Sequence, residues 1–254
     1  MKKNKKKNLN KYWDRYRKLY SFEEFSAIYR EKELLNSVSF SEKNILEVGC
    51  GFRPFFLSSK KFKSYIAIEP GKDAFTAVKK LSNRKKNVKV FNTTFEQWDF
   101  SKNKIKFDLI ILPGVLHEVD NAIKILKLCE SYLARKGKIY INVPNANSLH
   151  RKLAVAMGIN KKVSDFTYRN KKLEQNYVFT NNDLYSLVNK ASKNLKVVKI
   201  RSFFLKPFTH EQMLKSVSSK IICPKIIKGL YNISDEIGDL GSELACILEF
   251  KNAK

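Results

Sequence analysis

Two glycines and two glutamates are spaced so that they could bind one ligand. Gly49 and Gly51 follow a short apolar segment, Glu47 stands two residues before the first glycine, and Glu69 ends the next apolar segment. A glycine accepts positive φ and, lacking a Cβ, lets a ligand approach the main chain closely. A carboxylate attracts an ammonium group, and an acid roughly 20 residues after such a turn accepts hydrogen bonds from ribose hydroxyls. These residues predict a site for a ligand with an amine and a ribose.

The third glycine of a dinucleotide-binding turn is missing. That fingerprint needs a glycine three residues after the second one, and Pro54 stands at that place. A carboxylate at Glu47 would also repel a pyrophosphate. S-adenosylmethionine carries an amine and a ribose without a diphosphate, so it is the predicted cofactor. The sequence predicts a helix that opens near Arg53 and Pro54 after the turn. The alternative to a cofactor site is a turn that merely connects the strand to this helix.

Four segments resemble the class I S-adenosylmethionine-dependent methyltransferases: ILEVGCG (45–51), IAIEP (66–70), FDLIILPGVLHEVDN (107–121) and GKIYINVPN (137–145). They span about the first two-thirds of the chain, and the pattern departs from its commonest form where Arg53 replaces a glycine. Arg53 could itself pair with the methionine carboxylate.

The resemblance implies an enzyme and a set of cofactor contacts. Glu96 would bond the adenine amino group and Phe95 would flank it, although Phe95 and Trp98 could equally be core aromatics. The cofactor-binding residues expected in this way are Glu47, Val48, Gly49, Cys50, Gly51, Glu69, Pro70, Phe95, Glu96, Leu112 and Pro113.

His117 is the candidate general base. Methyl transfer to a hydroxyl or protonated amine needs alignment and removal of a proton, and an imidazole titrates near neutral pH. His117 follows the predicted fourth strand, and Glu118 beside it could orient the ring. The alternative is a histidine at a helix start that bonds only main chain or solvent. We expect no metal, since that strand end offers no carboxylate after Asp108.

Two further passages, VPNANSLHRKLAVAMG and FFLKPFTHEQM, resemble bacterial methyltransferases that modify sugars, nucleotide sugars and surface polysaccharides. Arg151 and Lys206 would then suit an anionic acceptor, although they could be ordinary surface charges. The candidate substrate residues are Tyr16, His150, Arg151, Lys206 and His210. The predicted function is methyl transfer to an oxygen or nitrogen of a small molecule, with a sugar or nucleotide sugar favoured. An RNA methyltransferase and a catalytically silent binding protein are the rivals.

Short apolar segments alternate with helical ones, which predicts a doubly wound α/β fold. The resemblance implies seven strands in a mostly parallel sheet with an antiparallel last strand. Asp73 would cap the helix over 73–81. The strands are expected at 45–48, 64–69, 87–92, 107–112 and 138–143, and by resemblance at 194–201 and 244–250.

The N-terminal residues and two long segments lie outside the strands and helices of this predicted fold. Residues 1–36 are expected to form a basic tail and an N-terminal helical lid. Aromatic residues recur at helical spacing from 11 to 36, which by itself indicates an amphipathic helix that packs on the core; the lid is implied because the YWDRY segment resembles the N-terminal helix that closes over the cofactor in related methyltransferases. Residues 37–254 would form the methyltransferase domain. Within it, the segments 145–179 and 203–241 are longer than loops in compact domains usually are, which predicts a substrate lid and a possible homodimer surface.

The 254 residues carry a formal net charge of +26, most of it from lysine. A basic surface attracts polyanions, but lysines dispersed along the whole chain favour a solvated surface, so a nucleic-acid partner is not expected. The four cysteines are far apart, which suits a reducing compartment. We found neither a secretory signal nor a run long enough to cross a bilayer, and we expect a cytoplasmic protein.

Overall fold

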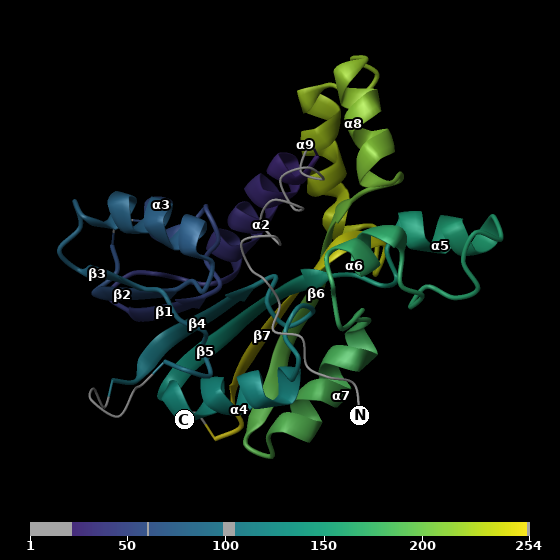
Figure 1. Ribbon diagram of the computed structural model, residues 1–254. Coiled ribbons are helices and arrows are strands. Elements are labelled where there is room, and N and C mark those ends of the chain that lie inside the picture. Colours follow the sequence, from purple (N-terminus) through teal and green to yellow (C-terminus); the bar gives the residue numbers. More distant parts are fainter. Residues whose placement is uncertain (1–21, 60, 99–104, 253–254) are drawn as a thin grey trace.

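The computed structural model describes residues 22–59, 61–98 and 105–252. They form a seven-stranded sheet in the order β3-β2-β1-β4-β5-β7-β6, with helices on both faces (Figure 1). Strands β1 to β5 run parallel, and β7 runs antiparallel to both β5 and β6. The predicted doubly wound fold is confirmed. The strands are β1 (Asn44–Val48), β2 (Ser64–Ile68), β3 (Val88–Phe91), β4 (Phe107–Pro113), β5 (Leu133–Pro144), β6 (Leu195–Leu205) and β7 (Gly241–Phe250).

Each face of the sheet has its own hydrophobic core, because successive side chains of a strand point to opposite faces. Leu46 of β1 faces the helices α4 (Ala122–Tyr132) and α7 (Asn181–Ala191). Ile45 faces the other side, which is covered by α2 (Glu23–Ser37), α3 (Lys72–Ser82), α8 (His210–Ser218) and α9 (Pro224–Asn232). Strand β4 lies in the middle of the sheet and is buried on both faces, as its continuous apolar sequence predicts.

The prediction of a helix after the glycine turn is wrong. The chain forms only a short 3₁₀ turn, η1 (Phe55–Leu57), after Pro54 in an extended conformation. Phe55 and Phe56 are buried in the core on the α2 side, and the Phe55 N–H donates to the Glu47 carboxylate at 3.2 Å. Anchoring these two rings to the sheet leaves too little chain before β2 for an amphipathic helix.

The prediction that Asp73 caps α3 is also wrong. Gly71 occupies the N-cap without a side-chain cap, and Asp73 lies in the first turn instead. A carboxylate there still interacts favourably with the positive end of the helix. By contrast, Asn121 caps α4 by accepting from the Lys124 N–H at 2.9 Å.

The two long segments carry extra helices near the carboxyl ends of the parallel strands (Figure 1). Segment 145–179 contains α5 (Leu149–Ala156) and α6 (Tyr168–Lys172), and segment 203–241 contains α8, α9 and a second 3₁₀ turn, η2 (Ile233–Asp235). Of the expected N-terminal helix the structure describes α2, whereas Tyr16 lies outside the described residues. In the part of the chain that the structure describes, none of the helices has the length and apolarity that crossing a membrane requires.

Candidate active site

One large cavity opens at the carboxyl ends of the parallel strands. Its volume is about 1130 Å³, and its wall combines the ends of β1, β2 and β4 with residues of α2, α6 and α8. Binding pockets for a single drug-sized ligand usually measure about 300–1,000 Å³. This cavity therefore has room for a nucleoside cofactor and a second, smaller molecule.

The glycine turn forms one wall of the cavity. Gly49 and Gly51 have φ of +74° and +56°, a region that residues with a side chain adopt at a cost. A Cβ at Gly49 would lie 2.8 Å from Val115 Cγ2. The Glu69 carboxylate secures the turn by accepting hydrogen bonds from the main-chain N–H groups of Gly51 (2.9 Å) and Gly71 (2.7 Å).

Glu47 lies behind this turn and not on the cavity wall. Its side chain is fully buried on the same face of the sheet as Ile45, and its Oε2 accepts from the Tyr65 hydroxyl at 2.7 Å. Burial raises the pKa of Glu47 to about 8. Its Oε1 has no hydrogen-bond partner among the described residues. The expectation that Glu47 and Glu69 flank the same pocket is not met, because only Glu69 reaches the wall.

The other predicted cofactor residues divide in the same way. Val48, Gly49, Glu69, Pro70, Phe95, Glu96 and Pro113 line the cavity. Cys50, Gly51 and Leu112 are not among the lining residues: Cys50 and Leu112 have core side chains, and Gly51 acts through its N–H to Glu69. Residues 92–94 and Gln97 also line this end of the cavity and were not predicted from the sequence. Asn92 fixes the end of β2 by donating to the Glu69 carbonyl at 2.9 Å.

His117 lies on the wall after β4 and is almost completely buried. Its Nε2 lies 3.6 Å from Glu118 Oε1, and its carbonyl accepts from the N–H of Asn176 at 2.9 Å. Gly114, with φ of +69°, leaves room beside the imidazole, since a Cβ there would lie 3.6 Å from His117 Cε1. The His117 side chain therefore borders the cavity. Its role as a general base stays a prediction.

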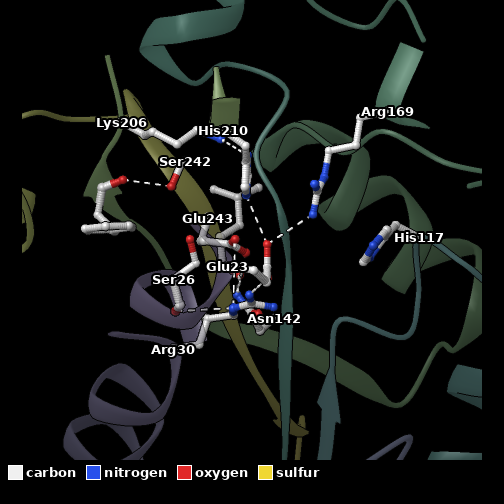
Figure 2. A network of polar contacts seen from close by, with 12 residues as sticks. Glu23, Ser26, Arg30, His117, Asn142, Arg169, Lys206, His210, Ser242 and Glu243 are labelled. Carbon is white, nitrogen blue, oxygen red and sulfur yellow. Dashed lines mark hydrogen bonds and ion pairs between the residues drawn. The ribbon is translucent and has the colours of Figure 1, made fainter. Parts of the chain in front are cut away.

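A polar cluster lines the cavity on the side of α2, α6 and α8 (Figure 2). We call it the Glu23 cluster, and it consists of Glu23, Arg30, Arg169, Lys206 and His210. The Glu23 carboxylate forms ion pairs with Arg30 and with Arg169 (3.2 Å) and contacts His210 Nε2 at 3.0 Å. Lys206 Nζ lies 2.8 Å from His210 Nδ1. Lys206 and His210 were predicted from the sequence, but the other three were not, because only tertiary packing brings Glu23 to Arg169, 146 residues away, and to His210, 187 residues away.

Positive charge accumulates around Lys206, which is only 4% exposed. Burial, together with the neighbouring charges of Arg169, Arg151 and Arg30, lowers the pKa of Lys206 to about 7. Burial and the same kind of neighbours hold the pKa of His210 well below its ordinary value. A carboxylate can only accept hydrogen bonds, so His210 Nε2 carries the proton and donates to Glu23, while Nδ1 accepts from Lys206.

Arg151 and His150 differ in what they present to the cavity. Arg151 donates to the carbonyls of Val163 (2.8 Å) and Asp165 (3.0 Å) and to Asn170 Oδ1 (2.7 Å), which ties α5 to α6. Its guanidinium therefore has a structural function in this conformation. His150 lines the cavity, and burial lowers its pKa. Among the described residues, no group of three or more histidine, cysteine, aspartate or glutamate side chains could hold a metal ion.

The sheet order, the antiparallel β7 and the cavity beside the glycine turn define the class I S-adenosylmethionine-dependent methyltransferases. The profile of the "Methyltransferase domain" family matches residues 15–199 of this sequence. The chain belongs to that family, and its cofactor is S-adenosylmethionine.

Comparison with individual proteins supports the fold. The chain is 28% identical over 116 residues to peramine synthetase ppzA of Metarhizium rileyi (strain RCEF 4871), a match that covers 42% of the chain and 4% of that protein's length. A methyltransferase of Thermotoga maritima, a possible histamine N-methyltransferase, superposes with a TM-score of 0.58 at 17% identity, covering 96% of this chain and 98% of that one. The plantazolicin methyltransferase BpumL, in complex with a substrate analogue and S-adenosylhomocysteine, superposes with a TM-score of 0.55 at 16% identity over 94% and 88% of the two chains.

Proposed function

We propose that this methyltransferase acts on an oxygen or nitrogen of a small molecule that carries an anionic group, such as a sugar phosphate or a nucleotide sugar. The observation that carries the proposal is the shared cavity, whose wall has the glycine turn and Glu69 on one side and the Glu23 cluster on the other. A cofactor and a charged acceptor can thus occupy neighbouring parts of the same cavity.

The first side fits S-adenosylmethionine, which supplies a methyl group bound to a sulfonium. Each carboxylate oxygen of Glu69 accepts one main-chain hydrogen bond, and a carboxylate has about four acceptor positions in all. Glu69 can therefore accept from ribose hydroxyls while it still holds the turn. Glu96 is exposed on the same wall, where it can accept from an adenine amino group.

The second side fits an acceptor with negative charge. Arg30, Arg169 and Lys206 face the carboxylates Glu23 and Glu243, and all five line the cavity. Arginine recognises phosphate and carboxylate groups with paired N–H donors, and such bonds are stronger in a recess than in bulk water. Because Arg169, Lys206 and His210 lie in the segments 145–179 and 203–241, these segments would form the acceptor wall, as the predicted substrate lid requires.

His117 is the residue best placed to remove the acceptor's proton. It lies on the wall directly after β4, and the adjacent Glu118 can stabilise the imidazolium that forms when the imidazole takes a proton. The acceptor oxygen or nitrogen would form its new bond to the methyl carbon as the carbon–sulfur bond of the sulfonium breaks and the acceptor's proton passes to His117, with S-adenosylhomocysteine as the leaving group.

An RNA acceptor is the second candidate, supported only by the net charge of +26. The cations of the Glu23 cluster are recessed, with Lys206 4% exposed, whereas binding of a phosphate backbone uses many exposed cations and depends steeply on salt. The geometry therefore favours the small acceptor. A homodimer and a cytoplasmic location remain predictions.

The test is transfer of a radiolabelled methyl group into three pools: nucleotide sugars and sugar phosphates, neutral sugars, and RNA. We expect incorporation into the first pool, with a loss of at least tenfold in kcat/KM for Lys206→Met, since a hydrogen bond to a charged group contributes about 1.5–3 kcal/mol. Lys215→Met is the matched control, because Lys215 is an exposed residue of α8 paired with Glu211. Equal labelling of neutral sugars, or labelling of RNA alone, would reject the proposal.

A further inference from the structure

The Glu23 carboxylate lies on the cavity wall where several cationic or basic side chains gather. Three groups from three different helices converge on it: Arg30 of α2, Arg169 of α6 at 3.2 Å, and His210 of α8 at 3.0 Å (Figure 2). Lys206 reaches the other nitrogen of the His210 ring. Glu23 itself is 5% exposed and lines the cavity. A side chain of the protein thus stands where a bound anion would meet several cationic donors.

We infer that this is the binding position for a phosphate group of the acceptor, and that Glu23 fills it as an internal substitute until the acceptor displaces it. The inference rests on the proposed function, because it requires an acceptor that carries an anionic group. It adds to that function the position at which the acceptor's phosphate binds. It also adds that the Glu23 carboxylate competes for that position and so inhibits acceptor binding in the empty enzyme.

The substitute has a physical reason. A buried cation without an anion is strongly destabilising; Lys206 is buried, and Arg30 and Arg169 beside it are partly buried. Glu23 and Glu243 provide the compensating charge when no acceptor is bound. Even with both carboxylates in place, burial and the charges of the neighbouring arginines lower the pKa of Lys206 to about 7.

A phosphate can compete with Glu23 for the same donors. It offers more acceptor oxygens than a carboxylate and a charge of about −1.5 to −2 near pH 7. Two arginines and a lysine can all donate to one such group, whereas the Glu23 carboxylate contacts the two arginines and His210 and leaves Lys206 to bond the histidine ring. Displacing Glu23 would therefore free Lys206 and His210 for the acceptor.

The displacement need not disturb the rest of α2. Glu23 is the first residue of that helix, and Leu34 anchors the helix to the core further along. Glu33, on the same helix, has a separate ion pair with Arg201 and accepts from the Tyr231 hydroxyl at 3.0 Å. Glu33 does not line the cavity. The N-cap residue Phe22 is fully buried in the same core, so acceptor binding would displace the Glu23 side chain and leave the helix in place.

Glu33 supplies the matched control for a test. Both Glu23 and Glu33 are buried, belong to α2 and pair with arginine, but only Glu23 borders a space that a free anion can enter. The probe is inorganic pyrophosphate, titrated by calorimetry and by thermal unfolding at constant ionic strength adjusted with chloride. The proteins compared are the natural chain, Glu23→Gln and Glu33→Gln.

We expect Glu23→Gln to bind pyrophosphate at least tenfold more tightly than the natural chain, since an internal competitor that fills a site more than 90% of the time weakens binding by that factor. Its Tm should be lowered in chloride and restored by pyrophosphate. The Tm of Glu33→Gln should also be lowered, but pyrophosphate should not restore it. Adding Arg169→Met to Glu23→Gln should abolish the gain.

Equal pyrophosphate affinity in the natural chain and Glu23→Gln, or equal restoration of Glu33→Gln, would overturn the inference. If Glu23→Gln does not fold, Arg169→Met alone decides: unchanged weak binding of pyrophosphate relative to the natural chain excludes this position. The proposed function fails separately, when no anionic acceptor is methylated although Glu23→Gln binds pyrophosphate tightly. Conversely, turnover of an anionic acceptor with no gain in Glu23→Gln removes only the inference.

Discussion

The carboxylate of Glu69 accepts a hydrogen bond from the main-chain N–H of Gly51 at 2.9 Å and so joins the ends of β2 and β1 at the cavity. Its other oxygen accepts from the Gly71 N–H at 2.7 Å, at the start of α3. One buried side chain thereby fixes the glycine turn and the beginning of a helix. The same carboxylate is the proposed ribose ligand, so the shape of the turn and the affinity for the cofactor should change together.

Glu69→Gln should weaken S-adenosylhomocysteine binding by about 10- to 100-fold. The amide would place an NH₂ group against one of the two main-chain donors, and an unsatisfied buried donor costs about 1–3 kcal/mol. Calorimetric titration checks this expectation. Asp73→Asn is the control, because Asp73 is an exposed acid in the first turn of α3. An unchanged affinity in Glu69→Gln would show that Glu69 is not a cofactor ligand.

Gly49→Ala should lower both stability and cofactor affinity, whereas Gly158→Ala should lower stability only. The two glycines have nearly equal φ, +74° and +73°, so both alanines bear a similar backbone cost of about 1–2 kcal/mol. Only at Gly49 does the new Cβ meet a neighbour, Val115 Cγ2 at 2.8 Å; at Gly158 nothing lies within 4 Å. Urea unfolding and S-adenosylhomocysteine titration of both variants separate the two effects. Equal cofactor affinities would contradict the assignment of the turn to the cofactor site.

The sheet was largely predictable from local patterns. Five apolar segments end at turn residues such as Gly49 and Pro113, and the structure has strands at all five. The helix after the turn was not predictable in this way. Its absence results from the burial of Phe55 and Phe56 against the sheet, and sequence alone does not show which aromatic residues the core takes up.

Local spacing was less informative for the site. Residues close to Gly49 and Glu69 in sequence were found, since strand order places the carboxyl ends of β1 and β2 side by side. Glu23, Arg30 and Arg169 were missed, because only tertiary packing brings α6 and α8 to the Glu23 carboxylate with which Arg30 also pairs. The direction of the Glu47 side chain was also missed. The alternation along β1 could have indicated it, since Glu47 shares a face with Ile45.

Glu47 should make the stability of the protein depend on pH. Burial raises its folded-state pKa to about 8 from the ordinary value of 4.5, so the folded chain holds a proton that the unfolded chain releases. Stability from this group is therefore present below about pH 4.5 and is lost as pH rises towards 8, by at most about 1.4 kcal/mol per pH unit. Glu47→Gln should remove that slope. Urea unfolding at pH 5 to 8 measures it, and parallel profiles for the two proteins would show that Glu47 is ionised when folded.

His117→Asn should lower kcat by about 10²- to 10⁴-fold, the usual contribution of a positioned acid or base, while S-adenosylhomocysteine affinity stays near that of the natural chain. Asparagine keeps a polar side chain of smaller volume at this nearly buried position but cannot take up a proton. Glu118→Gln should cost less, because Glu118 Oε1 lies 3.6 Å from the imidazole and acts only through it. The pH profile gives the sharper test, since a base that must be unprotonated makes kcat fall on the acid side, and this limb should disappear in His117→Asn. A variant with undiminished kcat, or one that retains the acid limb, would assign the proton to another group on the cavity wall.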